Sequence, residues 1–251
     1  MPYRILPALL LACLVVFLPG CLKYKQVVTV NPDGSGKVLI TVAMSEDALA
    51  MNMATSGADP FADFRTQELI GQERQGFVAF TQPVTSVADG YRQMSVTGYF
   101  EDIGELILGE DDGDLRATTF EHQPGQLTVK HGVFHQIANE PDFSRAIEDP
   151  EMRATVQKMI AGFELTEAYV LPGAVTEAGA FATQDNQASA YINAEMILSE
   201  QLTPLADQKD AAVVQVRYEG QAWSAGSQAQ WAVELAAARA AWAELKAAAT
   251  D

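Results

Sequence analysis

Three histidines, His122, His131 and His135, are the residues of this chain whose type most readily suggests metal chemistry. Imidazole is the commonest transition-metal ligand in proteins. If the Pro-Gly pair at 124–125 turns a hairpin, His131 lies about 13 Å along the ladder from His122 at ~3.3 Å per residue, and His135 lies farther still. No cysteine or paired carboxylate completes a ligand set. The sequence therefore predicts surface histidines and no metal site.

An acidic run at 109–114 could bind a hard cation such as calcium, because such ions take several carboxylate and carbonyl oxygens. The run does not fit the EF-hand loop. With Gly113 as the turn glycine, the first and twelfth ligand positions fall on Leu108 and Thr119, and neither can serve. We expect a solvated surface loop here, with a loose extracytoplasmic cation site as the alternative.

Common motifs of nucleophilic and hydrolytic catalysis do not occur in the sequence: Gly-x-Ser-x-Gly, His-Glu-x-x-His and Ser-x-x-Lys. Gly34 and Gly36 could suggest a phosphate cradle, but such a cradle needs a helix after it, and a strand is predicted to follow them. We therefore expect a protein that is not an enzyme and that needs no cofactor.

The amino-terminal segment has the layout of a bacterial secretion signal. Arg4 precedes an apolar run at 5–18, and the small residue Gly20 stands directly before Cys21. The segment 18–21, Leu-Pro-Gly-Cys, resembles a lipobox, in which the cysteine sulfur receives a diacylglycerol before cleavage between Gly20 and Cys21. A membrane-spanning anchor would need about 20 apolar residues. Lipidation of Cys21 is the main prediction, and plain secretion and an uncleaved anchor are the alternatives.

The net charge limits the partners of the protein. The chain has 251 residues and a formal net charge of −17. Such a surface repels nucleic-acid phosphates and anionic headgroups, so no nucleic-acid partner is expected and membrane attachment must come from the lipid on Cys21. The other cysteine, Cys13, lies inside the signal, so the mature chain has no disulfide. Two or more acyl chains on Cys21 would give stable membrane attachment.

The remaining chain, 21–251, reads as a single α+β domain after a signal at 1–20. Alternating apolar residues and turn clusters predict strands, and apolar residues at helical spacing predict helices. The region 84–90 is expected to be a connection. Strands are expected at 24–30, 38–42, 77–81, 91–100, 116–121, 127–133, 163–171, 188–198 and 213–220; helices are expected at 46–52, after Asp59-Pro60, at 150–161 and at 227–248.

The helix at 150–161 carries the clearest apolar stripe in the chain. Asp149 before Pro150 predicts its start, because aspartate caps helices and proline suits the first turn. The stripe is either an ordinary core face or the lining of a pliable apolar pocket, to which methionines are suited. The candidate pocket residues are Met152, Val156, Met159, Ile160 and Phe163, with Met44, Met94 and Phe100 on neighbouring elements.

Two segments together resemble the LppM-type bacterial lipoprotein domain. The first is 27–36, Val-Val-Thr-Val-Asn-Pro-Asp-Gly-Ser-Gly, and the second is 170–175, Val-Leu-Pro-Gly-Ala-Val, followed by Asp185-Asn186 and 188–192. The resemblance implies a curved antiparallel sheet packed on one core helix and a link to lipid or glycolipid handling at the cell envelope. The amphipathic helix at 227–248 departs from relatives that carry a transmembrane helix at this end.

These observations favour a non-enzymatic lipoprotein, anchored through Cys21, that binds a lipid, a glycolipid or an envelope partner. The runner-up is a structural or assembly protein whose Trp231–Trp242 seam packs on another chain. An enzyme is third, and would gain support if folding brought buried carboxylates or His131 into one cleft. In a diderm host, Leu22 after the modified cysteine suggests the outer membrane.

The lipidation prediction can be tested in the host cell. Growth with a fatty-acid analogue should label the wild-type protein and leave Cys21→Ser unlabelled, because the hydroxyl of serine cannot form the thioether. Labelling is read from the purified chain after electrophoresis. A wild-type protein that takes up no label contradicts the prediction.

Overall fold

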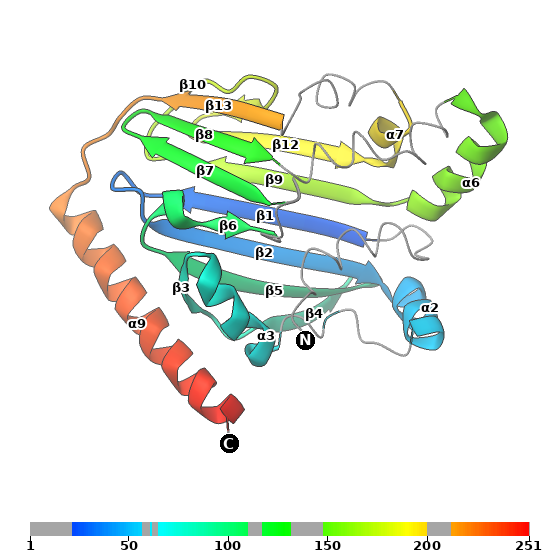
Figure 1. The fold of residues 1–251 in the computed structure, drawn as a ribbon, viewed down its shortest axis with the longest axis horizontal. Coiled ribbons are helices and arrows are strands. Elements are labelled where there is room, and N and C mark those ends of the chain that lie inside the picture. The colour runs from blue at the N-terminus through cyan, green and yellow to red at the C-terminus, as the bar shows by residue number, and fades with distance from the viewer. Residues whose placement is uncertain are drawn as a thin grey trace.

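A computed structural model describes residues 22–56, 61, 65–109, 117–131, 148–199 and 212–250. This part of the chain forms two β-sheets with helices at their ends and along one side (Figure 1). The expected α+β class, with mainly antiparallel strands and a C-terminal helix, is confirmed. The predicted signal segment, Cys21, His135 and residues 110–114 of the acidic run lie outside the described residues.

The larger sheet has eight strands in the order β11-β12-β9-β1-β2-β5-β3, and β4 pairs with β5 beside β3. Neighbours are antiparallel except for β1 and β9, which run parallel. The strands are β1 (Leu22–Val30), β2 (Gly36–Ser45), β3 (Phe77–Phe80), β4 (Val84–Ala88), β5 (Tyr91–Phe100), β9 (Glu164–Val170), β11 (Ala182–Gln184) and β12 (Gln187–Asn193).

The smaller sheet has the order β10-β13-β8-β7-β6 and lies over one face of the larger sheet (Figure 1). Its strands are β6 (Ile107–Leu108), β7 (Thr118–Gln123), β8 (Gln126–His131), β10 (Val175–Glu177) and β13 (Ala212–Tyr218). We call the face of the larger sheet beneath it the inner face. The rings of Phe120 and Tyr169 meet edge to face there, with centroids 6.2 Å apart.

The predicted hairpins form with the expected registers. Val28 pairs with Val38 between β1 and β2, and the backbone of Gly34 turns the chain at a φ of 88° that favours glycine. His122 faces Leu127 across the β7–β8 turn, where Gly125 has a φ of 82°, as a type II turn requires.

Helix α6 (Pro150–Ile160) begins as predicted, because the Asp149 carboxylate accepts hydrogen bonds from the backbone N–H groups of Glu151 and Met152. The helix lies beyond the ends of the strands, and the smaller sheet covers the inner face of the larger one (Figure 1). The other helices are α2 (Glu46–Ser56), α3 (Thr66–Gly71), η2 (Gln72–Gln75), η3 (Ile103–Glu105), α7 (Ala194–Ile197) and α9 (Ala225–Thr250).

Three local predictions were wrong. The expected connection at 84–90 contains strand β4, which pairs with β5. The expected strand at 188–198 ends at Asn193, whose side chain caps α7 by accepting from the Met196 N–H. Helix α2 runs to Ser56, beyond the expected end at 52. The predicted helix start at Asp59-Pro60 lies outside the described residues.

Helix α9 packs its tryptophan seam on its own chain. Trp242 is 1% exposed, meets Phe80 edge to face at 5.3 Å, and donates its indole N–H to Glu73 at 2.7 Å. Trp231 lies 5.9 Å from Tyr99. Leu235, Ala238 and Trp242 are buried, and Trp231 and Leu245 are partly buried against the core. Contact of this seam with another chain stays a prediction, and it would have to use the parts of these side chains that remain exposed.

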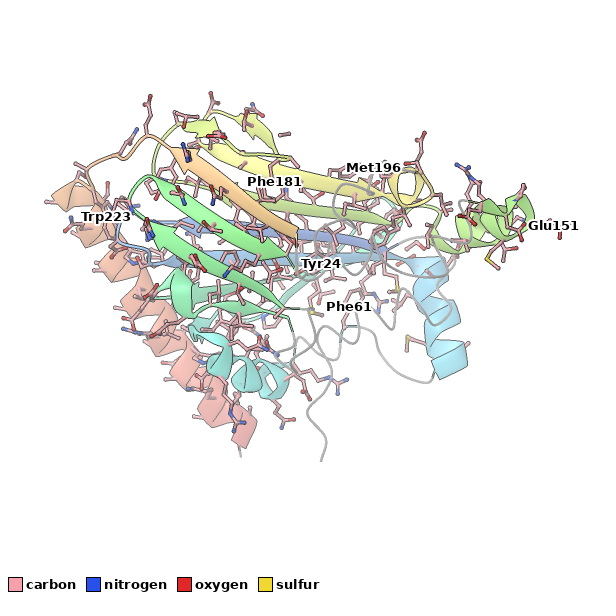
Figure 2. The ribbon with its side chains drawn as sticks, turned by 45° about the horizontal axis from the view of Figure 1, so that its top comes forward. Tyr24, Phe61, Glu151, Phe181, Met196 and Trp223 are labelled. Carbon is pink, nitrogen blue, oxygen red and sulfur yellow. The ribbon has the colours of Figure 1, made fainter. Side chains whose placement is uncertain are left out.

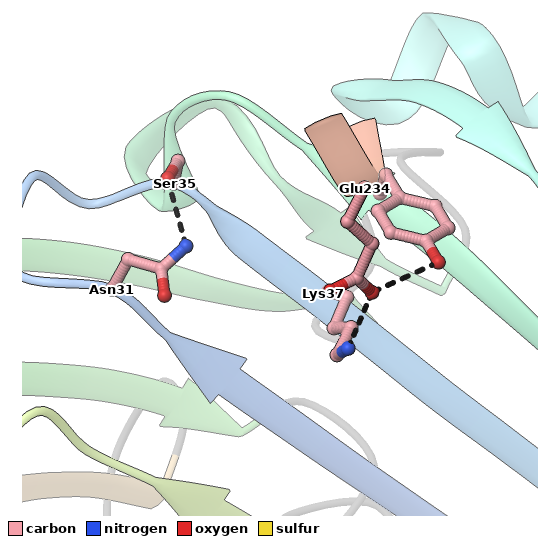
Figure 3. Close-up of polar contacts among 5 residues, drawn as sticks. Asn31, Ser35, Lys37 and Glu234 are labelled. Atoms are coloured by element: carbon pink, nitrogen blue, oxygen red, sulfur yellow. Dashed lines mark hydrogen bonds and ion pairs between the residues drawn. The ribbon is translucent and has the colours of Figure 1, made fainter. Parts of the chain in front are cut away.

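Polar contacts near the middle and near the C-terminal end of α9 also hold it against the larger sheet and η2. Lys37 and Tyr99 both donate to Glu234, at 2.5 and 3.2 Å (Figure 3). The Lys246 ammonium lies 2.6 Å from the Glu73 carboxylate. The helix begins at Ala225, two residues earlier than predicted, and the hydroxyl of Ser224 accepts from the Ser227 N–H in its first turn. No helix among the described residues is long and apolar enough to cross a bilayer.

The docking of α9 should depend on pH through Glu73. Burial raises the pKa of Glu73, but hydrogen bonds from Lys246 and Trp242 outweigh burial and leave this pKa below its usual value. The ionised carboxylate therefore stabilises the fold above about pH 5, and this stability is lost as the pH falls below about 4. Glu73→Gln should lower the free energy of unfolding by about 0.5–1 kcal/mol at pH 7 and by less at pH 3.

Tryptophan fluorescence during urea unfolding at each pH measures the difference between wild type and Glu73→Gln. Lys130→Gln, which removes an exposed ion pair with Glu121, is the matched control. An equal difference at pH 7 and pH 3 would show that the charge of Glu73 does not contribute.

Candidate functional site

A cluster of polar side chains lies buried between the two sheets, where His131 of β8 faces Glu167 of β9. Nδ1 of His131 is 3.2 Å from Oε2 of Glu167, and the same oxygen accepts the hydroxyl hydrogen of Tyr169 at 2.9 Å. His131 is fully buried and Glu167 is 3% exposed. The expectation that the histidines lie on the surface is therefore wrong for His131. Strand alternation explains the error, because His131 follows Leu127 and Val129 on the inward side of β8.

Strand β1 extends this cluster through Gln26 and Tyr24. Gln26 pairs with Glu167 across the parallel β1–β9 ladder, which places both side chains on the inner face. Tyr24 donates its hydroxyl hydrogen to the Gln26 side-chain oxygen at 2.8 Å. Figure 2 shows Tyr24 near the ends of the strands of the smaller sheet. We call Tyr24, Gln26, His131, Glu167 and Tyr169 the interior polar cluster.

Both phenols of the interior polar cluster are kept neutral. Burial, followed by the charge of Glu167, raises the pKa of Tyr24 far above its usual value. Burial likewise raises the pKa of Tyr169, with further increases from the charge of Glu167 and the hydrogen bond to it. The phenols therefore keep their hydroxyl hydrogens, which they donate to Gln26 and Glu167, and they do not act as bases.

Aromatic rings surround the carboxylate–imidazole pair. Phe181 stacks on Tyr169 with ring centroids 5.7 Å apart and an interplanar angle of 5°, and it meets His131 at 5.2 Å. These rings exclude water and lower the local dielectric, which strengthens the interaction between His131 and Glu167. A carboxylate or imidazole buried here is therefore stable only while the polar side chains around it stay in place.

A second polar contact lies at the opposite end of the smaller sheet. Nε2 of His122 is 2.8 Å from the hydroxyl oxygen of Tyr218, and the ring packs above the backbone of Gly34 in the β1–β2 turn. Burial lowers the pKa of His122, and the nearby charges of Asp102 and Asp33 offset only part of that decrease. The imidazole is therefore neutral at pH 7 and fixes the smaller sheet to this turn.

The inner face continues past the interior polar cluster toward Leu22. Strand β8 ends at His131, opposite Glu167, whereas β1 and β9 extend to the pairs formed by Tyr24 with Leu165 and by Lys23 with Glu164. Apolar side chains cover this extension, which we call the anchor-proximal region because it begins next to Cys21. Its inner-face residues are Leu22, Val42, Met44, Met94, Leu165 and Ile192.

The predicted pocket residues lie at the border of this region. Val156, Ile160 and Phe163 are buried in the apolar core, and Met152 packs against it. The side chain of Met159 lies outside the described residues. The structure thus places four of the five in or against the core, an arrangement that suits either a core face or a ligand lining. Of the neighbouring residues named with them, Met44 and Phe100 are buried, and Met94 packs against the core.

Among the described residues, no group of three His, Cys, Asp or Glu side chains is close enough to hold a metal ion. His122 and His131 take part in different contacts, with Tyr218 and with Glu167. The chemistry available to the interior polar cluster is hydrogen bonding and the close contact of an imidazole with a carboxylate. Sequence reasoning missed this cluster, although Gln26 and Glu167 at inward strand positions were a usable signal.

Comparisons with known proteins give a structural likeness and no sequence match. No protein-family model matches the chain, and no curated protein matches its sequence. Among solved structures, the folded domain of LppM from Mycobacterium tuberculosis, determined by NMR, is similar with a TM-score of 0.38 and 11% sequence identity. The match covers 84% of this chain and 95% of that one. This is a distant likeness of arrangement, to a member of the family that the two sequence segments resemble.

The effects of substituting His131 and Glu167 on the free energy of unfolding should not be additive. Glu167→Leu is expected to lower the free energy of unfolding by about 3–5 kcal/mol, because it leaves the buried phenol of Tyr169 without its acceptor and the buried imidazole of His131 without the carboxylate beside it. The double variant His131→Leu/Glu167→Leu should cost less than the sum of the two single variants, by at least about 1 kcal/mol.

Chemical denaturation of the four chains gives this coupling energy. The exposed Lys130–Glu121 pair, which joins the same smaller sheet, is the matched control and should give less than about 1 kcal/mol. Additive effects of the His131 and Glu167 substitutions would show that the two side chains do not interact.

Proposed function

We propose that this chain is a bacterial envelope lipoprotein, anchored through a lipid on Cys21, whose two-sheet domain binds an apolar ligand such as a lipid or glycolipid. The observation that carries the proposal is the position of β1. This strand begins at Leu22, directly after the proposed lipidated cysteine, and lies in the middle of the larger sheet. The domain is therefore joined to its anchor without a spacer.

This short connection restricts where the domain can act. A flexible linker would let a domain sample space far from the bilayer. A strand with β2 on one side and β9 on the other is fixed in direction from its first residues, because Lys23 already pairs with Ala43 and Glu164. The domain therefore remains within reach of molecules in the membrane surface, which favours ligands with lipid chains.

The anchor-proximal region supports an apolar ligand. Its methionines, Met44 and Met94, are polarisable side chains that repack readily around an inserted chain. The interior polar cluster borders it and presents two neutral phenols and a carboxylate, which can bind the polar group of the same ligand by hydrogen bonds. A lipid or glycolipid combines these two chemistries in one molecule.

The lipoprotein acts without catalysis in this proposal, and its location follows from the residue after Cys21. Leu22 is not an aspartate, which would favour retention in the inner membrane, so in a diderm host the outer membrane is the proposed site. The membrane contact is made by the covalent lipid, and an envelope protein that receives or delivers the ligand is the proposed partner.

Native mass spectrometry of the detergent-extracted full chain tests ligand binding. We expect a non-covalent adduct of lipid mass in addition to the covalent modification. Ala190→Phe should reduce the adduct by at least tenfold, because Ala190 pairs with Glu167 on the inner face and a phenyl ring there fills space beside the interior polar cluster.

The control is Ser189→Phe, which places the same ring one residue away on the opposite face of β12. This variant should keep the adduct. A wild-type protein that carries the covalent lipid but no adduct contradicts ligand binding. Equal loss in both variants would show that the effect is not specific to the inner face.

A further inference from the structure

The outer face of the larger sheet, which points away from the smaller sheet, carries a continuous row of small, polar and partly apolar side chains. Strand pairing places these residues side by side across six strands, over about 24 Å at ~4.8 Å per strand. We call this set the outer row. Its members, in order across the sheet, are Tyr191, Thr166, Lys25, Thr41, Ser95 and Val84.

Much of the outer row is open to solvent. Tyr191 is 46% exposed and Val84 is 61% exposed at its two ends, and Leu39 in a neighbouring row is 40% exposed. Helix α9 covers the hairpin end of this face, where Glu234 binds Lys37 and Tyr99 (Figure 3). The anchor-proximal end of the same face has no such contact with α9 among the described residues.

Two lysines and two tyrosines gather at the anchor-proximal end. The Lys23 ammonium lies 4.9 Å from the centroid of the Tyr91 ring and 3.2 Å from the Glu164 carboxylate. The hydrogen bond with Glu164 raises the pKa of Lys23, so this side chain is charged at neutral pH. Lys25 and Tyr191 lie in the outer row beside this group.

We infer that the anchor-proximal half of the outer face lies on the headgroup layer of the membrane that holds the lipid on Cys21. This inference rests on the proposed function, because it needs the lipid. It adds an orientation: the larger sheet faces the bilayer and the smaller sheet faces away from it.

The short distance along the chain between Cys21 and Lys23 supports the bilayer as the partner of this face. Lys23 is two residues from Cys21, which corresponds to about 7 Å of extended chain. A lipid inserted in the bilayer therefore brings the end of β1 to the headgroups. Because β1 pairs with β2 and β9 from its first residues, the outer ends of those strands come with it.

The side-chain chemistry supports the same partner. Tyrosine and lysine are suited to membrane interfaces, since tyrosine has an apolar ring with a polar tip and lysine can extend its ammonium to the headgroups. Lys23, Lys25 and Glu164 give this patch one excess positive charge in a chain of net charge −17. The nearby acids Glu46, Asp47 and Asp89 stand in α2 and in the β4–β5 turn, outside the strands.

This local arrangement differs from the whole-chain expectation. The net charge predicts that lipid docking through basic groups is disfavoured, yet two lysines and two tyrosines lie together on the face next to the anchor. The covalent lipid supplies the affinity, and the outer face determines which side of the domain meets the bilayer.

Site-directed spin labelling tests this orientation. The full lipidated protein, with Thr41→Cys or Val213→Cys, is labelled and reconstituted into vesicles of phosphatidylethanolamine and phosphatidylglycerol. Neither natural cysteine offers a free thiol in the proposed mature chain. Thr41 lies in the outer row, and Val213 is 45% exposed on β13 of the smaller sheet.

The collision rate of the label at position 41 with a water-soluble nickel chelate should be at least threefold lower on vesicles than in detergent. The label at position 213 should change little. Adding Lys25→Gln and Tyr191→Ser should restore much of the accessibility at position 41. Fatty-acid labelling of each sample confirms that the anchor is present.

Equal accessibility at both positions in anchored protein would overturn the orientation and leave the proposed function standing. Protein that carries no lipid would overturn both. Dipolar coupling between labels at position 41 of two molecules would show that a second copy, and not the bilayer, covers the outer face, and would also overturn the inference.

Discussion

The parallel pairing of β1 with β9 is the constraint on which the rest of the structure depends. It places the first described strand in the middle of the larger sheet, with β2 on its other side. Parallel neighbours need a long crossover, and here the chain leaves β1 at Val30 and returns to start β9 at Glu164, which lies beside Lys23 at the other end of β1. The strands β6, β7 and β8 belong to this crossover, which is why the smaller sheet lies over the inner face.

The interior polar cluster costs free energy to bury, and its contacts restrict how the two sheets can be placed on each other. Burying a carboxylate in an apolar core is unfavourable unless its partners come with it. His131 comes from the smaller sheet, and Glu167 and Tyr169 come from the larger one, so the pair fixes how one sheet sits on the other. A ligand that enters beside this cluster would meet hydrogen-bonding groups whose positions are set by the fold.

Local patterns predicted local structure well. The β1–β2 hairpin followed from alternating residues around Asn31-Pro32-Asp33-Gly34, and α6 followed from Asp149-Pro150, because turns and caps depend on a few adjacent residues. The separate smaller sheet and the burial of His131 could not be predicted, since both depend on which strands meet across the chain. The α9 seam was recognised, but its contacts with Phe80 and Tyr99 were not predicted, because amphipathicity does not identify the surface that covers it.

The position of β1 also determines when this protein can finish folding. Synthesis releases the amino end first, and β1 can pair at once with β2, but its second partner does not exist until Glu164 and the residues after it have been made. Contacts so distant along the chain form slowly because of the entropy of closing such a large loop. The nascent polypeptide therefore stays incompletely folded for most of its translation.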